Sequence, residues 1–303
     1  MIHRGQIAPL LRPGLRKDFR DSYNEYPVEY NMYLKEGTMD RAEIEAMTMS
    51  GLPRQPARGE VEPVTYFDPE FSPKTIYTDV EYASGMSVSR RSIEDDQYGK
   101  ANQKAKYLGR STRLTQEYEA AAFLEDAFTG AVFRGFNNEP LISATHSLLG
   151  ASGTWTNLVA GNPPLGVTGM ESALELSERL VDQDGNPIPM RVNKLIFKIR
   201  DWAKVTKLLG GEKEPFTANN QVNAIREKVG QGLTRVMPHY WSQTGRQWFL
   251  VDSTLSDAHF LFKLRPEFDD HDDFMTKAAF FDARQRFLIY FYDQRGWIGS
   301  NAT

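Results

Sequence analysis

The stretch SIEDDQYGKANQKAKYLGRSTRLTQEYEAAAFLEDAF, residues 92–128, decides how the rest of the chain is interpreted. It opens on Ser92 with Asp95 three residues later, a spacing typical of a helix N-terminus, and Gly130 follows as a stop signal. At ~1.5 Å per residue the helix would be roughly 50 Å long. Its apolar stripe is narrow, which indicates a helix that lies across a surface. The stripe consists of Ala101, Ala105, Leu108, Thr112, Thr115 and Ala122.

Three basic residues of this helix, Lys106, Arg110 and Arg113, fall away from the apolar stripe at helical spacing. Two interpretations are open. The first is an ordinary solvated helix face, and the second is a basic strip that faces the phosphates of DNA.

Upstream of the helix, residues 60–89 alternate in the manner of β-strands. Two apolar runs, around Val61–Phe67 and Ile76–Val88, predict a β-hairpin, and an isolated hairpin is marginally stable in water. We therefore expect this hairpin to pack against a neighbouring subunit. The predicted tip consists of Asp68, Pro69, Glu70, Phe71, Ser72, Pro73 and Lys74.

The first 59 residues are polar and interrupted by proline at five positions, which predicts an extended arm. The spacing around residues 38–49 predicts one short helix within the arm. The prolines are Pro9, Pro13, Pro27, Pro53 and Pro56.

Downstream of the long helix, residues 130–169 are rich in Gly, Asn and Pro and predict an irregular passage. An α/β unit should follow, with a helix over residues 170–181 and a strand over 192–199. Asp201 is placed to cap a second helix that ends at Gly210 and Gly211. Further strands are predicted at 233–237, 247–251 and 287–292, the last of them buried on both faces.

Composition excludes several function classes. The 303 residues carry a net charge of -4 and no cysteine, which argues against a dedicated nucleic-acid reader and against thiolate chemistry. No apolar run is long enough for a membrane span, and the first residues lack a signal-peptide core. No Gly-x-Ser-x-Gly elbow, Walker loop or dinucleotide fingerprint occurs. We therefore predict a protein without catalytic residues or cofactors.

The densest acidic cluster is Asp269-Asp-His-Asp-Asp273. It lacks the glycine and the spacing of a calcium loop, so the sequence favours a solvated loop over a metal site. If the chain were a soluble α/β enzyme, this cluster would be the candidate centre.

The order of elements, together with several short motifs, resembles the major capsid proteins of tailed phages, whose fold is named after phage Hong Kong 97 (HK97). The resemblance covers roughly residues 60–300. The motifs are Ser89-Arg-Arg-Ser-Ile-Glu-Asp-Asp96 with Tyr98, Leu141-Ile-Ser-Ala-Thr-His146 with Gly153-Thr-Trp-Thr-Asn157, Asp184-Gly-Asn-Pro187 with Leu195-Ile-Phe197, and Arg295-Gly-Trp-Ile-Gly-Ser300.

This resemblance implies an α+β fold in five parts. Residues 1–59 would be the N-terminal arm and 60–91 the extended loop (E-loop). Residues 92–167 would be the P domain, with the spine helix at 92–128. Residues 168–257 would form the A domain, and 258–303 would return to the P domain.

The implied function is that of a virion shell subunit that is assembled in the bacterial cytoplasm from hexamers and pentamers. The implied partners are other copies of the chain, a scaffolding protein, a portal, decoration proteins and non-specifically bound double-stranded DNA. An encapsulin-type nanocompartment subunit is one alternative. A lysine to asparagine cross-link at Lys74 lacks a supporting motif, and the arm is too short for a cleaved scaffolding domain.

Overall fold

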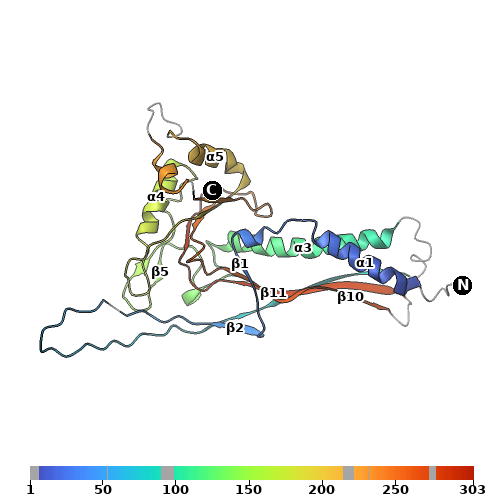
Figure 1. Cartoon of the computed structure of the whole chain (residues 1–303), viewed down its shortest axis with the longest axis horizontal. Coiled ribbons are helices and arrows are strands. Elements are labelled where there is room, and N and C mark those ends of the chain that lie inside the picture. The colour runs from blue at the N-terminus through green and yellow to red at the C-terminus, as the bar shows by residue number, and fades with distance from the viewer. Residues whose placement is uncertain (1–6, 53, 90–98, 214–221, 231, 273–277) are drawn as a thin grey trace. The chain divides into compact units, whose positions relative to one another are not determined.

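The structure is a computed structural model that describes residues 7–52, 54–89, 99–213, 222–230, 232–272 and 278–303. The chain divides into two compact units, each with its own sheet (Figure 1). Unit 1 comprises Met1–Glu43, Thr78–Ala121 and His259–Ile289. Unit 2 comprises Ile44–Tyr77, Ala122–Ala258 and Tyr290–Thr303.

Unit 1 is built on a four-stranded sheet in the order β1-β10-β11-β4. β4 is antiparallel to β11 from Val88 opposite Ala279 to Val80 opposite Phe287, and β1 is parallel to β10. The predicted buried strand at 287–292 is confirmed as the end of a longer strand. The strands are β1 (Lys35–Thr38), β4 (Val80–Val88), β10 (His259–Asp272) and β11 (Ala279–Tyr290).

Two helices pack on this sheet, α1 (Ile7–Tyr23) and α3 (Lys100–Asp126). Leu15 of α1 and Ala105 of α3 share a small core with the sheet residue Phe281. Because the α3 contacts are small side chains, the helix lies close along the sheet as its narrow stripe predicts. The long helix is thus confirmed where the structure describes it, and its predicted start at residues 92–98 lies outside the described residues.

The prediction of an extended N-terminal arm is wrong for residues 7–23, which form the helix α1. Pro13 lies inside α1, and Pro9 lies in its first turn, where a missing N–H breaks no helical hydrogen bond. Leu15 and Phe19 are buried one helical turn apart, so tertiary packing stabilises the helix. The short helix predicted at 38–49 is also wrong, because that segment contains β2 (Glu43–Ala46).

Unit 2 contains a second four-stranded sheet, in the order β12-β9-β7-β8. Two helices, α4 and α5, bury apolar side chains in one core with Leu195, Leu250 and Ile298 of the sheet. This confirms the predicted α/β unit. Its elements are α4 (Val167–Glu178), β7 (Lys194–Phe197), α5 (Trp202–Gly210), β8 (Thr234–Val236), β9 (Trp248–Val251) and β12 (Trp297–Ser300).

The other face of this sheet is covered by aromatic rings. Phe249 stacks on Phe128 at 5.3 Å and on Trp241 at 5.6 Å between centroids, and Phe123 meets Trp297 edge-on at 5.9 Å. Cores on both faces explain why all four residues of β9 and of β12 are buried, whereas Thr234 and Arg235 of β8 are exposed.

Short elements complete the fold, and the passage 130–169 is irregular as predicted. They are η2 (Tyr30–Met32), η3 (Phe136–Asn138), β5 (His146–Ser147), β6 (Thr154–Trp155), η4 (Ile199–Asp201) and η5 (Arg226–Gly230). Asp201 precedes α5 but makes no side-chain cap bond; its carboxylate instead pairs with Lys204 at 3.5 Å and Arg246 at 3.3 Å.

The acidic stretch from Asp269 to Asp272 is not a loop. It ends the long strand β10, whose residues alternate between the packed and the exposed face of the sheet. The alternation of charged with apolar residues in residues 259–270 is the strand signal that the sequence prediction missed.

Candidate interaction surface

A long hairpin leaves the body of unit 2 between β2 and β3 (Thr75–Thr78), which pair with each other (Figure 1). Met49 forms an antiparallel bridge with Phe71, a pairing that is symmetric about residue 60. The turn accordingly lies at residues 59–62, where the N–H of Glu62 donates to the carbonyl of Gly59 at 3.3 Å.

The predicted hairpin therefore exists, but two details of the prediction are wrong. The first strand of the pair is β2 and not the run 61–67, in which no strand is assigned. The predicted tip, residues 68–74, lies in the returning arm near its base. The prolines in residues 68–74 predicted a turn, but proline is also tolerated on the unpaired edge of a strand.

The base of the hairpin is fixed by buried hydroxyl groups. The Oγ of Ser72 lies 2.6 Å from the Tyr292 hydroxyl and accepts the N–H of Thr48 at 2.9 Å. The Oγ of Ser50 accepts the N–H of Glu70 at 2.9 Å. The Tyr77 hydroxyl donates toward the carbonyls of Arg134 and Phe291, both at 2.9 Å, and burial raises the pKa of Tyr77. These bonds fix the hairpin where it leaves the body of unit 2.

Beyond this base the hairpin exposes large apolar side chains to water. Val61 is 94% exposed and Tyr66 is 90% exposed. In residues 63–69, all of them described, no hydrogen bond to the rest of the chain is formed, so the backbone groups are also open. The remaining exposed apolar residues of the hairpin are Met47, Met49, Leu52, Val64, Phe67, Phe71 and Ile76.

The residues predicted at the tip divide into two groups. Ser72 is buried in the anchor, and Lys74 pairs with Glu45 across the base. Asp68, Glu70 and Phe71 are exposed on the returning arm. The inter-subunit role of residues 68–74 stays a prediction.

The three basic residues of α3 face the N-terminal segment of unit 1. Arg110 makes a two-pronged bond to Glu25 at 3.0 and 3.1 Å, and Lys106 lies 3.8 Å from Asp18. Arg113 is only 5% exposed, and its guanidinium lies 3.9 Å from the centroid of the Tyr23 ring. A DNA-facing role stays a prediction, and burial makes Arg113 the weakest candidate of the three.

Glu117, a buried acid of α3, was not predicted from the sequence. Its two carboxylate oxygens accept the backbone N–H groups of Glu29 and Tyr30, both at 3.1 Å, at the entry to η2. Burial is the main reason that the pKa of Glu117 is raised to about 7. The side chain thus fastens the segment before β1 to the long helix. The available signal was an acid at helical spacing from the basic residues Lys106, Arg110 and Arg113.

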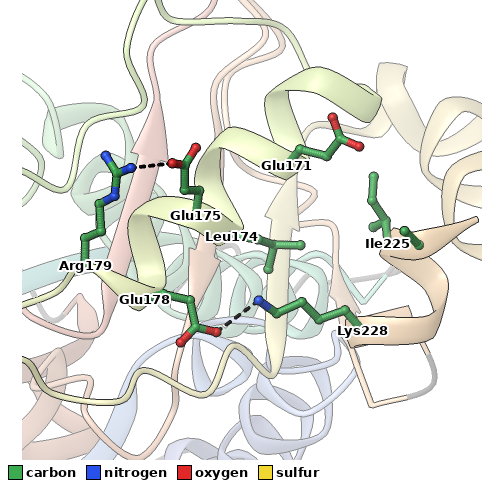
Figure 2. A pocket seen from close by; sticks show the side chains of 8 residues that line it. Glu171, Leu174, Glu175, Glu178, Arg179, Ile225 and Lys228 are labelled. Atoms are coloured by element: carbon green, nitrogen blue, oxygen red, sulfur yellow. Dashed lines mark hydrogen bonds and ion pairs between the residues drawn. The ribbon is translucent and has the colours of Figure 1, made fainter.

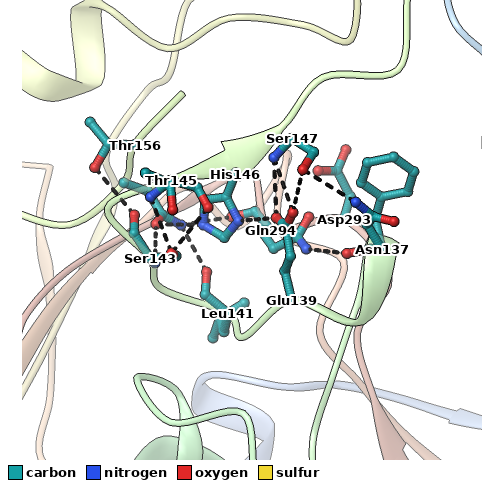
Figure 3. A network of polar contacts seen from close by, with 12 residues as sticks. Asn137, Glu139, Leu141, Ser143, Thr145, His146, Ser147, Thr156, Asp293 and Gln294 are labelled. Atoms are coloured by element: carbon teal, nitrogen blue, oxygen red, sulfur yellow. Dashed lines mark hydrogen bonds and ion pairs between the residues drawn. The ribbon is translucent and has the colours of Figure 1, made fainter. Parts of the chain in front are cut away.

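Two motifs that carried the resemblance meet in one buried network (Figure 3). The Nδ1 of His146 lies 2.8 Å from Glu139 Oε2, its Nε2 lies 2.9 Å from Asn157 Oδ1, and its ring stacks on Trp155 at 4.5 Å. Burial lowers the pKa of His146, while the bonds to Glu139 and Asn157 act against it. Asn157 also accepts the N–H of Ser143, so the network fixes an irregular passage and has a structural role.

A pocket of about 400 Å³ lies between α4 and η5 in unit 2 (Figure 2). Leu174 and Ile225 contribute apolar lining, while Glu178 and Lys228 form an exposed ion pair at 3.0 Å. Glu175 and Arg179 form a second ion pair in its lining, and none of its polar side chains is a nucleophile in contact with a base.

Among the described residues no group of three or more acidic or histidine side chains is placed to hold a metal ion. Asp273, the last member of the acidic cluster, lies outside the described residues. No helix in the described ranges is long and apolar enough to cross a membrane.

No family model and no curated protein matches this sequence. Solved structures do match. The capsid of cyanophage P-SCSP1u is similar with a TM-score of 0.56 at 12% identity, over 89% of this chain and 86% of that chain. The capsid of Myoviridae phage XM1 is similar with a TM-score of 0.53 at 8% identity, over 92% and 97%. A virus-like particle from Pyrococcus furiosus is similar with a TM-score of 0.51 at 9% identity, over 94% and 97%.

The matched regions cover 89% to 94% of this chain and 86% to 97% of the solved chains. Identity this low supports a shared fold and no more. The predicted fold class is confirmed: the chain has the α+β fold of the HK97-like phage capsid proteins.

Proposed function

We propose that this chain is the major capsid protein of a tailed bacteriophage and that it acts as a non-enzymatic shell subunit. Its copies would form hexamers and pentamers that close into an icosahedral head around double-stranded DNA. Assembly would take place in the bacterial cytoplasm, and the mature protein would reside in the virion. A scaffolding protein, a portal and decoration proteins would be its further partners.

One observation carries this proposal: a chain with a capsid fold has a long hairpin whose large apolar side chains are not buried by the rest of the chain. Nine large apolar residues of the hairpin are exposed: Met47, Met49, Leu52, Val61, Val64, Tyr66, Phe67, Phe71 and Ile76. Exposed apolar surface of this extent marks a protein interaction site. Contacts with sister subunits would bury it, so that assembly stabilises the hairpin.

The parts of the fold receive roles on the same basis. We assign α3 as the spine helix of the P domain and residues 168–257, with α4 and α5, as the A domain. The extended loop would begin at β2, upstream of the predicted boundary at residue 60, because β2 is the first strand of the hairpin. Residues before β2 would form the N-terminal arm, which includes α1, and residues 258–303 would return to the P domain.

The test is assembly of the purified chain, followed by electron microscopy and sedimentation. Closed shells of uniform size are expected from the wild-type chain. A variant in which residues 55–65 are replaced by Asn-Gly should keep the anchored base but give unassembled subunits or capsomers. Shells of normal size and yield from this variant would refute the role of the hairpin, and a wild-type chain that stays monomeric at high concentration would refute the shell function.

Contact of α3 with packaged DNA is a separate proposal for Lys106 and Arg110, both of which keep partial exposure. Substituting both by Gln should lower DNA retention in filled heads more than the yield of empty shells. Equal losses in both measurements would support the alternative, a role confined to the ion pairs with Asp18 and Glu25.

The match to the Pyrococcus furiosus virus-like particle keeps an encapsulin-type compartment as the second candidate. Protein cargo in shells isolated from the native host would favour the compartment, and packaged DNA would favour the phage head. A soluble enzyme is the remaining alternative. It would require a measurable activity that is lost when Asp269 and Asp270 are substituted by Asn.

A further inference from the structure

The two faces of the hairpin differ in charge. Between residues 47 and 74 every charged residue occupies an even-numbered position: Arg54, Arg58, Glu60, Glu62, Asp68, Glu70 and Lys74. The odd-numbered positions carry no charge, and apolar residues predominate among them, whereas the even-numbered positions mix the charged residues with Leu52, Val64 and Tyr66. They include Met47, Met49, Val61, Pro63, Phe67, Pro69, Phe71 and Pro73. Successive residues of an extended strand point to opposite faces, so an alternation of two separates one uncharged face from one charged face.

The base of the hairpin shows which face is which. Met49 and Phe71 are bridge partners, so their side chains share a face, and both are exposed. Their neighbours Ser50 and Ser72 are buried on the opposite side and form the anchor to unit 2. The uncharged face therefore points away from the unit to which the hairpin is attached. This is the reverse of a self-contained monomer, in which the apolar side of a strand faces its own core.

The outer edge of the returning arm is poorly suited to strand addition. At the base, the N–H of Ser50 donates to Glu70 and the N–H of Ser72 donates to Thr48, so even-numbered backbone groups point inward between the arms. Odd-numbered backbone groups point to the outer edge. The returning arm has proline at 63, 69 and 73, and therefore lacks three of the N–H donors that a further strand would need. A partner would therefore contact this arm through the side chains of one face.

We propose that the uncharged face of the hairpin, the odd-numbered residues 47–51 and 55–73, is the surface that packs on a second copy of this chain, while the face that carries the charges stays outside this contact. This inference rests on the proposed shell function and specifies the contact within it. The absence of charge on the docking face excludes nucleic acid as its partner. Solved chains of this fold are found in capsids and in a procapsid, which makes a second copy the appropriate occupant.

The test places the same charge on adjacent residues of opposite faces. Thr65→Lys adds a lysine to the uncharged face, and Val64→Lys adds one to the charged face; both positions are exposed in the isolated chain. Thr65→Lys should raise the protein concentration required for shell assembly at least about tenfold, because a lysine without a partner would be buried. Val64→Lys should assemble like the wild type, although it removes the larger apolar side chain.

Phe71→Lys with Glu70→Lys is a second pair for the same comparison, closer to the anchored base. Equal impairment by both members of each pair would overturn the one-faced contact while leaving the hairpin in the interface. Normal assembly of Thr65→Lys and Phe71→Lys would also overturn it. Failure of the shell function itself would be distinct, because the wild-type chain would then form no shells.

Discussion

Removing the carboxylate of Glu117 should release the segment that leads into β1. Glu117 is 1% exposed and accepts two backbone N–H groups, from Glu29 and Tyr30. Glu117→Ala leaves both donors without this acceptor, at about 1–3 kcal/mol for each buried group. Glu117→Ala also removes the cost of burying the carboxylate, which offsets part of this loss. We therefore expect the free energy of unfolding to fall by about 2–4 kcal/mol. Glu117→Gln keeps one acceptor and should cost about half as much.

The assay is hydrogen exchange at the amides of residues 29 and 30, combined with urea unfolding of dissociated subunits. Exchange at these two amides should accelerate in Glu117→Ala, with a smaller change in Glu117→Gln. Glu171→Ala, the same substitution at an exposed position on α4, is the matched control and should change neither measurement. Unchanged exchange at residues 29 and 30 in Glu117→Ala would refute the fastening role of the carboxylate.

The pH dependence supplies an independent check. Burial raises the pKa of Glu117 from 4.5 to about 7, so the folded protein holds a proton that the unfolded chain releases between these values. The corresponding stability is fully present below about pH 4.5 and is lost as the pH rises through 7. The difference in unfolding free energy between wild type and Glu117→Gln should therefore move in favour of the variant from pH 5 to pH 8, by about 3 kcal/mol at most. A constant difference over this range would contradict the raised pKa.

Two further predictions concern the hairpin base and the turn beside it. Ser72→Ala and Tyr292→Phe each remove the 2.6 Å bond between the two hydroxyls and should each destabilise the base of the hairpin by about 1–3 kcal/mol. The expected result is faster limited proteolysis of the hairpin. Equal proteolysis rates in wild type and variants would exclude this bond as an anchor. Gly150→Ala would place a Cβ atom against Asp184 Oδ1 and 2.9 Å from the Cβ of Ser50, and should lower the melting temperature. Gly210→Ala, where the Cβ meets nothing within 4 Å, should leave it unchanged or raise it.

Local periodicity was sufficient to predict much of unit 2. The helix α4, the strands β7, β8 and β9, and the helix α5 all lie within a few residues of their predicted positions. Each of these elements carries its own signal, such as the spacing of Leu174 and Ser177 or the double glycine after α5. The long helix α3 was predictable for the same reason, because its period extends over many turns.

The hairpin shows the limit of local signals. The sequence determined that residues around 61–88 would be extended and would need a partner, but the identity of the paired strands was misassigned. Pairing is decided by long-range register, here the bridge from Met49 to Phe71 and the anchor from Ser72 to Tyr292, and these contacts join residues far apart in the chain.

The sequence by itself determined the long helix and the α/β unit, because their hydrophobic periods are local properties of the chain. The fold class followed from the resemblance of the element order and the short motifs to the tailed-phage capsid proteins. Only the tertiary structure decided that the proline-containing residues 7–23 form a helix and that Arg113 and Glu117 are buried. In each of these cases the local propensity is weak or contrary. The free energy comes from packing and hydrogen bonds with distant segments, which no local pattern encodes.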